Sequence, residues 1–425
     1  MRLNEHTLRR KVVGEMHLRR WPKISAPMQI IQVLRLVSRE ERAAERAMLH
    51  DLPQGGELAP FVNQRHAEGD LGEGLSFVWE QHSEACGITL FIRDPSADPS
   101  AALDWLERFP GQAIRATRMH IVADEAEAER VLPTMGFVES DLVSCHIGVT
   151  PGLLAAGLEP VRLWSDFRVG PEGLGVSLIA ANGAIGNDLA RLLQRFQELG
   201  NYRNLALMGL PVAQAHWPGL DAAEEALRQL ATDVATPDKT DDALLESVSA
   251  LSLDLISLTT ETSYRMSATA AYAQLVEERL AGLAIRSIPG YPCLDDFTQR
   301  RLLPAIRTAR AYTHRQDVLS ARAAHFTSLL RTRVETRIEN QNGRLLRSME
   351  RSSSLQLRLQ QLVEGLSVVA LSYYGLSLLG YMLKGAEHRF EFIPAAEIMG
   401  LLVPVVVISM WLGLHRMKAK VMGEH

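Results

Sequence analysis

The stretch LVEGLSVVALSYYGLSLLGYML at residues 362–383, followed by IMGLLVPVVVISMWLGL at 398–414, decides the fold of this chain. A bilayer core about 30 Å thick needs about 20 apolar residues in a helix. The first stretch supplies 22 residues with a single charge, Glu364, and the second supplies 17 with Pro404 and no charge. Proline is tolerated in membrane helices. The pattern predicts a transmembrane hairpin, with a buried hairpin in a soluble core as the alternative.

The basic residues around the two stretches predict their orientation. Residues 300–358 contain thirteen arginines and four acids, whereas the loop at 384–397 has two basic residues against three glutamates. The tail at 416–425 carries Arg416, Lys418 and Lys420. Because basic segments remain in the cytoplasm, we expect a bacterial inner (cytoplasmic) membrane with both termini cytoplasmic. The first thirty residues contain no apolar run, so insertion is expected to depend on the hairpin.

The composition describes a soluble body attached to a small membrane part. The chain has 425 residues, 47% of them hydrophobic and 22% charged, with a net charge of −5, which predicts two to three structural units. Since residues 300–358 are basic, the remainder is acidic, which argues against nucleic-acid binding. Cys86, Cys145 and Cys293 lack a CxxC spacing and are interpreted as reduced thiols.

The first 180 residues alternate between short apolar runs and short helical patterns. Residues 75–82 and 88–93 predict a β-hairpin, and residues 53–74, rich in Gly, Pro and acids, predict a loop. A mainly antiparallel sheet in an α+β domain follows from this mixture.

Beyond residue 180 the patterns become helical. Helices are predicted at 185–199, 202–234 and 243–284, then a break at the IPGYP cluster 288–292. Residues 294–382 follow as one helix if Pro304 and Gly343 do not interrupt it. The predicted fold is an α+β cytosolic domain followed by an α-helical region with a long stalk helix and a C-terminal two-helix transmembrane hairpin. Its parts are the α+β domain (1–180), a helical bundle (181–292), the stalk helix (293–361), the first span (362–383), an outer loop (384–397), the second span (398–415) and a basic cytoplasmic tail (416–425).

A helix as long as the predicted stalk needs partners along its length. Residues at three- and four-residue steps form a stripe typical of a coiled coil. We expect two kinds of partner, the helices of 185–285 folded back and the same stalk in neighbouring subunits. The stripe consists of Phe326, Leu330, Val334, Ile338, Gln341, Leu345 and Met349.

Several motifs resemble those of bacterial membrane-anchored proteins grouped as domain-of-unknown-function family 3422. They are LRTRVETRIENQN at 330–342, RLQQLVEGLSVVALSYY at 358–374, HTLRR at 6–10, EMHLR at 15–19, WEQHSE at 79–84 and LWSDFR at 163–168. The resemblance covers essentially the whole chain and implies a membrane anchor. It brings no established activity with it.

The predicted architecture is also similar to that of the CorA magnesium channel family, in which a cytosolic domain continues through a stalk helix into a pore-lining first span. That resemblance implies a homo-oligomer, generally a pentamer. The family's Gly-Met-Asn motif at the outer end of the first span is absent here. The nearest string is GYMLKG at 380–385, so selectivity for magnesium is not carried over.

The polar residues of the first span are the candidates for a pore. Glu364 could form a ring of carboxylates at the cytoplasmic mouth of an oligomer, or pair with Arg358 at the headgroup level. Gly365, Gly375 and Gly380 would permit close helix packing, either around a pore or against the second span. The pore-lining candidates are Glu364, Ser367, Ser372, Tyr374, Ser377 and Tyr381.

In the soluble domain, Glu80, His82 and Glu84 alternate along a predicted strand and would point to one face. Two carboxylates and an imidazole could bind a divalent cation as a cofactor, or they could simply form a solvent-exposed face. No nucleophile elbow, phosphate-binding loop, HExxH motif or dinucleotide fingerprint occurs. An enzyme is therefore not expected.

The function predicted from the sequence is a homo-oligomeric cation channel or transporter of CorA-like architecture, gated by its cytosolic domain. The alternative is a non-conducting membrane-anchored scaffold or sensor whose cytosolic domain binds a protein or a small ligand. In both cases the expected partners include the bilayer and exclude nucleic acid.

Overall fold

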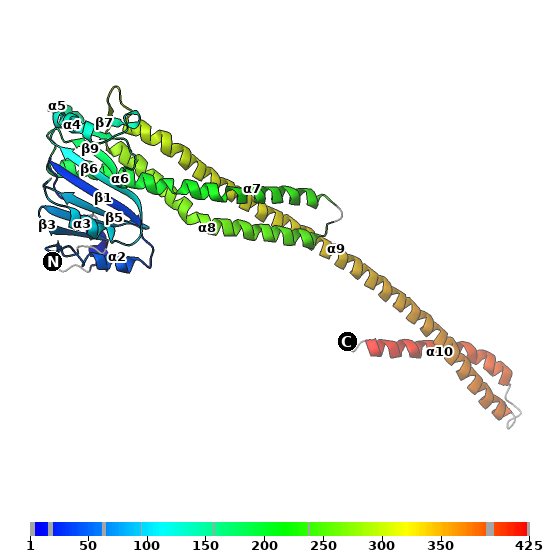
Figure 1. Cartoon of the computed structure of the whole chain (residues 1–425). Helices are drawn as coiled ribbons and strands as arrows, with labels where there is room; N and C mark the ends of the chain where they lie inside the picture. The colour runs from blue at the N-terminus through cyan, green and yellow to red at the C-terminus, as the bar shows by residue number, and fades with distance from the viewer. Residues whose placement is uncertain are drawn as a thin grey trace. The chain divides into compact units, whose positions relative to one another are not determined.

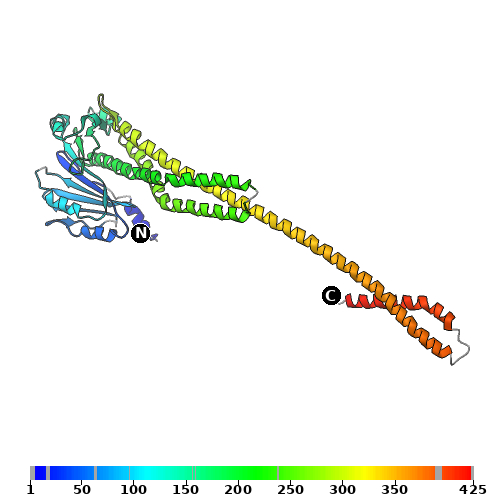
Figure 2. The same cartoon turned by 45° about the vertical axis from the view of Figure 1, so that its right-hand side comes forward.

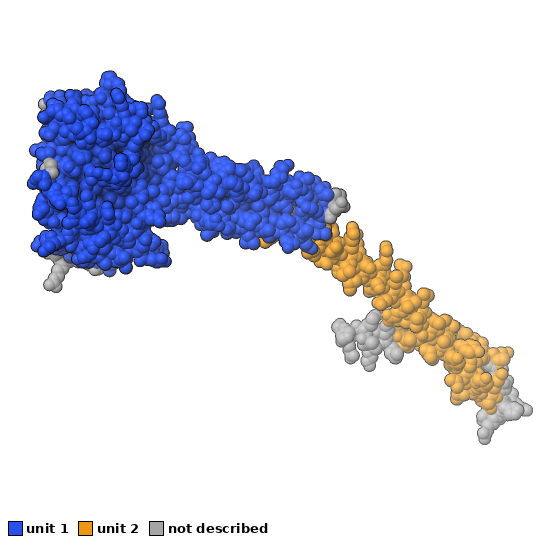
Figure 3. Space-filling model, viewed as in Figure 1, with its two compact units in different colours: residues 1–327 blue, residues 328–425 orange. Residues whose placement is uncertain are grey.

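The computed structural model describes residues 5–15, 20–61, 65–94, 96–155, 157, 159–236, 239–387 and 395–422. The chain divides into two compact units, residues 1–327 and 328–425 (Figure 3). An α+β region precedes a long helical region and a C-terminal helix, as the sequence predicted.

The first unit is built on one sheet, which has ten strands among the described residues (Figure 1). The order is β10-β7-β8-β9-β6-β1-β5-β4-β3-β2, and every named pair is antiparallel except β6 with β9. The strands are β1 (Met28–Leu36), β2 (Glu57–Leu58), β3 (His66–Gly72), β4 (Leu75–Gln81), β5 (Ala85–Ile92), β6 (Gln112–Val122), β7 (Val143–Ile147), β8 (Val161–Ser165), β9 (Gly175–Ala180) and β10 (Arg286–Ser287).

The predicted hairpin is confirmed as β4 and β5, which pair in the register Glu80 with Gly87. The predicted loop at 53–74 is wrong, because it contains β2 and β3. The sequence of β3, HAEGDLG, is polar and glycine-rich, but Ala67 and Leu71 are buried. The neighbouring backbone of β4 therefore recruits this segment despite its weak intrinsic strand propensity.

Both faces of the sheet are covered, and β1 shows how. Ile30 and Leu34 belong to one hydrophobic core, whereas Ile31 and Val33 belong to another, as the two-residue period of a strand requires. The first core includes residues of α6, α8 and α9. The second includes Leu49, just after α2 (Arg42–Met48), and Trp105 of α3 (Ser100–Glu107).

The helical part of the first unit contains α6 (Gly186–Leu207), α7 (Gly209–Val234) and α8 (Asp241–Gly282), and α8 packs against both of the others (Figures 1 and 2). The boundary between the first two lies at Met208, not near residue 200 as predicted. The shorter helices are α1 (Arg9–Glu15), α4 (Glu125–Val131) and α5 (Pro151–Ala155), with 3₁₀ turns at Leu132–Thr134 and Glu139–Asp141.

The helical pattern predicted over 294–382 is one continuous helix in the structure, α9 (Leu294–Glu387), which continues from the first unit into the second and has 94 residues. The last helix is α10 (Ala395–Met422). Among the described residues, three helices are long and apolar enough to cross a membrane, namely α8, α9 and α10. Of the outer-loop prediction, residues 388–394 lie outside the described part of the chain.

Candidate functional site

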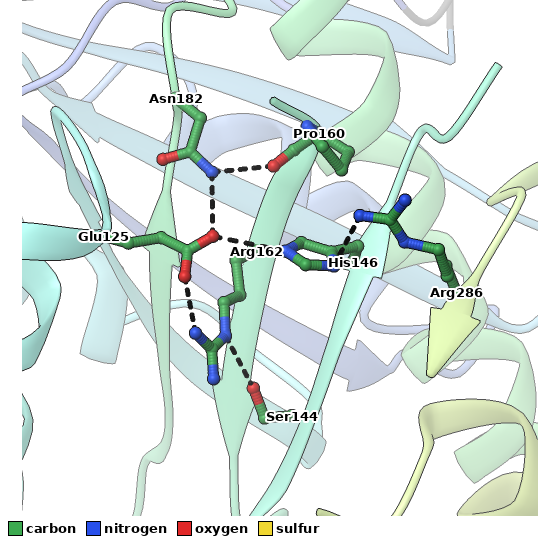
Figure 4. A network of polar contacts seen from close by, with 7 residues as sticks. All are labelled: Glu125, Ser144, His146, Pro160, Arg162, Asn182 and Arg286. Carbon is green, nitrogen blue, oxygen red and sulfur yellow. Dashed lines mark hydrogen bonds and ion pairs between the residues drawn. The ribbon is translucent and has the colours of Figure 1, made fainter. Parts of the chain in front are cut away.

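A network of polar side chains gathers around Glu125 at the start of α4 (Figure 4). Its carboxylate accepts hydrogen bonds from Arg162 at 2.5 Å, from Asn182 at 3.2 Å and from His146 Nε2 at 3.2 Å. Arg286 donates to His146 Nδ1 at 3.3 Å. The network thus links α4, β7, β8 and β10, and it holds the strand that directly precedes α9.

The network sets one carboxylate, that of Glu125, beside two arginines, Arg162 and Arg286. Burial raises the pKa of Glu125, but the hydrogen bonds from Arg162, His146 and Asn182 outweigh it and lower the pKa below its ordinary value. Because Nδ1 of His146 accepts from Arg286, Nε2 carries the proton that is donated to Glu125. No hydroxyl nucleophile is activated here, since Ser144 Oγ accepts from Arg162 Nε at 3.2 Å and is not bonded to the imidazole. The geometry is that of a structural ion pair.

A second arrangement brings two thiols together at the start of α9. The Ser144 backbone N–H donates to the Pro292 carbonyl at 3.2 Å, which places Cys145 of β7 beside Cys293. The hydrogen bond between the thiols lowers the pKa of Cys293 to about 6 and raises that of Cys145. Backbone N–H groups of the first turn of α9 also stabilise the Cys293 thiolate. Cys293 lines a cavity of about 860 Å³ between α8 and α9.

The third arrangement is a smaller pocket of about 290 Å³ between β6, β9, the segment after β8, and α6. Three arginines line it, and no Asp or Glu does so among the described residues. Arg168 is neutralised by Asp141 at 2.7 Å. Arg115 and Arg203 make no ion pair to any carboxylate in the described part of the chain. The complete lining is Ala113, Ile114, Arg115, Ala116, Thr117, Ser165, Phe167, Arg168, Val169, Gly173, Gly175, Ser177, Arg203 and Asn204.

Neutral amides hold Arg115 in place. Its guanidinium donates to Gln197 Oε1 at 2.7 Å and to Asn201 Oδ1 at 2.9 Å. It also rests against Gly200 of α6, where an added Cβ would lie 2.5 Å from Nη2. Burial, and then repulsion from Arg203, lowers the pKa of Arg115 to about 9. These amides fix the orientation of the Arg115 guanidinium but carry no negative charge that would neutralise it.

Aromatic rings hold Arg203. Its Cζ lies 4.9 Å from the ring centroid of Phe167 and 5.7 Å from that of Phe297 in α9. The two rings stack at 4.7 Å, and Phe167 has a φ of 52°, a left-handed conformation that is unusual for a bulky residue. Burial, and then Arg301, lowers the pKa of Arg203 to about 10. Sequence reasoning did not find this pocket.

The residues predicted to bind a divalent cation are drawn into other interactions. Glu84 accepts two hydrogen bonds from the guanidinium of Arg265, at 2.9 and 2.5 Å. The ring of His82 lies 6.3 Å from that of Tyr202, and Glu80 is buried within β4. The described residues contain no group of three or more His, Cys, Asp or Glu side chains that could hold a metal ion. The structure therefore offers no support for a metal at Glu80, His82 and Glu84.

The predicted pore residues lie on α9 within the second unit. Ser367 and Ser377 donate to carbonyls of their own helix at 2.7 and 2.8 Å, and Ser372 is buried. Glu364 accepts from Gln360 of the same helix at 3.4 Å. Tyr374 and Tyr381 are exposed in this single chain.

The predicted packing glycines face α10 in two of three cases. An added Cβ would lie 3.8 Å from Val406 at Gly375 and 2.7 Å from Met399 at Gly380, whereas it would meet nothing within 4 Å at Gly365. Two small residues therefore allow α9 and α10 to approach each other closely.

A ten-stranded α+β domain followed by helices apolar enough for a membrane defines a class of protein with a globular region and a candidate membrane region. The chain belongs to the family described as "Protein of unknown function (DUF3422)", whose model matches residues 4–421. A search of the curated proteins found no match. The resemblance to the CorA family gains no support from these comparisons.

Proposed function

We propose that this protein is a membrane-anchored sensor or scaffold, in which α9 and α10 form a transmembrane hairpin and the first unit binds a ligand. The observation that carries the proposal is the apolar surface of the second unit. Leu366, Leu378 and Leu401 expose 72%, 66% and 77% of their surface although a hairpin partner is present. Exposed apolar surface of this extent on two adjacent helices fits a bilayer and not water.

The packing of the hairpin favours an anchor over a pore. The side of α9 that holds Ser372, Gly375 and Gly380 is covered by α10 of the same chain. Ser367 and Ser377 satisfy their hydroxyls within α9, as serines in lipid-facing helices do. Small residues are therefore used to pack the hairpin, which is their usual role in membrane helices.

Flotation with liposomes tests the anchor. The full chain should rise with vesicles on a density gradient and resist extraction by high salt or carbonate, whereas residues 1–327 should remain in the soluble fraction. Release of the full chain by carbonate would contradict the proposal. Protease protection of tags at each terminus would test the proposed orientation, with both ends in the cytoplasm of a bacterial inner membrane.

A second candidate is the homo-oligomeric cation channel gated by the first unit. The observation in its favour is the stripe on α9 ahead of the first proposed span, where Ile338, Leu345 and Met349 are at least half exposed. A second copy of the same helix would cover that stripe as in a coiled coil. A ring of chains, a pentamer in this hypothesis, would bring Glu364, Tyr374 and Tyr381 of each copy toward an axis.

The mass of the particle in detergent, corrected for bound detergent, separates the two candidates. Four or more chains would support a channel, and cation flux into proteoliposomes should then fall in Glu364→Ala. A monomer or dimer leaves no central axis for the first span to line and contradicts the channel.

A further inference from the structure

We infer that the pocket lined by Arg115 and Arg203 is a binding site for a small organic or inorganic oxyanion, carrying a carboxylate or a phosphate group. The inference deepens the proposed sensor function and rests on it for its biological role. The site itself is argued from the charges, contacts and volume of the first unit alone.

The charges of Arg115 and Arg203 around the pocket are not balanced by nearby carboxylates in the described part of the chain. An enclosed charge in a folded protein is normally paired, because removing it from water is costly. Two other half-buried arginines of this unit are paired in this way, Arg162 with Glu125 and Arg265 with Glu84. Among the described residues, Arg115 instead contacts side-chain amides and Arg203 contacts aromatic rings, and neither is paired with a carboxylate. The two cations repel each other across the cavity. An anion bound between them would reduce this repulsion.

The surroundings of both arginines hold their guanidinium groups in a fixed orientation. Gln197 Oε1 and Asn201 Oδ1 occupy donors of Arg115, and Gln197 and Asn201 are themselves fixed, by hydrogen bonds to Thr117 Oγ1 at 2.8 Å and to Gln32 Oε1 at 2.9 Å. The guanidinium of Arg203 lies against the rings of Phe167 and Phe297, and within the described part of the chain its N–H groups donate to no acceptor. A guanidinium fixed in orientation is suited to bind a carboxylate or phosphate through two parallel hydrogen bonds.

The pocket has the size and lining of a small-molecule site. Its volume of about 290 Å³ lies at the lower end of the range for ligand pockets. The hydroxyls of Thr117 and Ser177 can supplement the arginines, while Ile114, Phe167 and Val169 provide an apolar wall. This lining suits an anion with a short carbon skeleton as well as inorganic phosphate. The pocket could accommodate no more of a macromolecule than one terminal group.

The site is connected to α9 through Phe297. Phe297 lies in the first turn of α9, stacks on Phe167 and contacts Arg203. An anion that pulls the guanidinium of Arg203 further into the pocket would alter its contact with the ring of Phe297. The same helix continues to Glu387, so the pocket is coupled by direct contacts to the start of the helix that forms the proposed anchor.

Titration calorimetry on the full chain in detergent tests the inference with two probes, inorganic phosphate and succinate, at constant ionic strength with chloride as the blank. At least one probe should bind, and which one binds identifies the phosphate or the carboxylate class. In Arg203→Met the dissociation constant should rise roughly tenfold or more, because a charge-assisted hydrogen bond is lost. Within the described residues the guanidinium of Arg203 contacts rings and makes no ion pair, so this variant is expected to fold.

Two further variants make the test specific. Gly200→Ala leaves every charge in place but displaces the guanidinium of Arg115, so it should weaken binding as well. Arg301→Met is the matched control, because Arg301 lies 4.0 Å from the same Phe297 ring but does not line the pocket. It should change the dissociation constant by no more than about threefold, as a screened charge would.

Absence of binding by both probes, or binding that Arg203→Met and Gly200→Ala leave unchanged, would overturn the inference. These outcomes are independent of liposome flotation. If the chain fails to float but binds an anion through Arg203, the anchor is wrong and the site stands. If it floats and binds neither probe, the site is wrong and the anchor stands.

Discussion

Helices α8 and α10 are both long and apolar enough to cross a membrane, yet the chain uses their apolar residues differently. In α8, Val248, Leu255 and Val276 are buried against the other elements of the first unit. In α10, Leu401, Val405 and Trp411 are exposed although α9 lies beside them. Length and apolarity alone therefore identify only candidates for membrane helices. A core helix differs from a proposed membrane helix because its apolar face packs against other parts of the protein.

The largest effect is expected when charged residues are placed on the proposed spans in α9 and α10, and the same change on the exposed face of α8 serves as the control. Val369→Arg combined with Val405→Arg puts one arginine near the middle of each proposed span, at a cost to insertion of about 5–7 kcal/mol in total. The double variant should lose liposome flotation and carbonate resistance. Leu253→Arg with Ile256→Arg is the matched control on exposed positions of α8, and it should float like the unaltered chain. Loss of flotation in the control alone would reverse the assignment of the two helices.

Truncation of one apolar side chain in each helix tests the same difference between α8 and α10 through the stability of the first unit. Leu255→Ala in α8 should lower the free energy of unfolding of the first unit by about 2–5 kcal/mol, because it creates a cavity. Leu401→Ala in α10 should leave that value unchanged. Urea unfolding followed by tryptophan fluorescence measures both, since five of the six tryptophans lie in the first unit. Equal effects of the two substitutions would remove the distinction.

A smaller effect is expected at the Glu125 network. Glu125→Gln keeps the shape but leaves Arg162 without its carboxylate, which should cost about 1–3 kcal/mol of stability. The native pKa of Glu125 is below its ordinary value of 4.5, so its stabilising effect is present above that pH and is lost as pH falls through the native pKa. The difference between the two proteins should therefore be full at pH 7 and shrink below pH 4.5. Glu172→Gln, in an exposed pair with Arg118, is the control and should cost no more than about 1 kcal/mol.

The smallest effect concerns the thiols. With its pKa lowered to about 6, Cys293 is mostly thiolate at pH 7, whereas Cys86 is buried and its pKa is raised. Iodoacetamide should alkylate Cys293 at least about tenfold faster than Cys86, as read by peptide mass spectrometry. The rate at Cys293 should decrease as pH falls through about 6, because the thiolate becomes protonated. Equal labelling of both cysteines would contradict the hydrogen-bonded arrangement with Cys145.

Most helices and strands could be predicted because their periodicity is local. The β4–β5 hairpin follows from alternation around a short turn, and α9 begins directly after the IPGYP cluster. Strand β3 could not be predicted, because its polar sequence becomes a strand only where β4 offers hydrogen bonds. The early end predicted for the first long helix reflects Gly200, which in the structure accommodates Arg115 in the middle of α6.

The candidate site was not predictable from one sequence. Arg115 and Arg203 are far apart in the chain and meet only because α6 packs over the sheet next to β6. One signal existed, an arginine in the middle of a strand whose neighbouring strands carry buried apolar residues on both faces. By contrast, Glu80, His82 and Glu84 are close in sequence, but the turn after β4 directs Glu84 toward Arg265. Proximity in sequence therefore does not by itself bring these three side chains to one site.

The strand order has a consequence for the behaviour of the protein at high local concentration. The outermost strands of the sheet, β2 and β10, are two residues long each. Edges this short offer few free backbone groups to an incoming strand and so discourage edge-to-edge aggregation. Many copies crowded onto one surface would keep their sheets separate, and any self-association would be left to the helices.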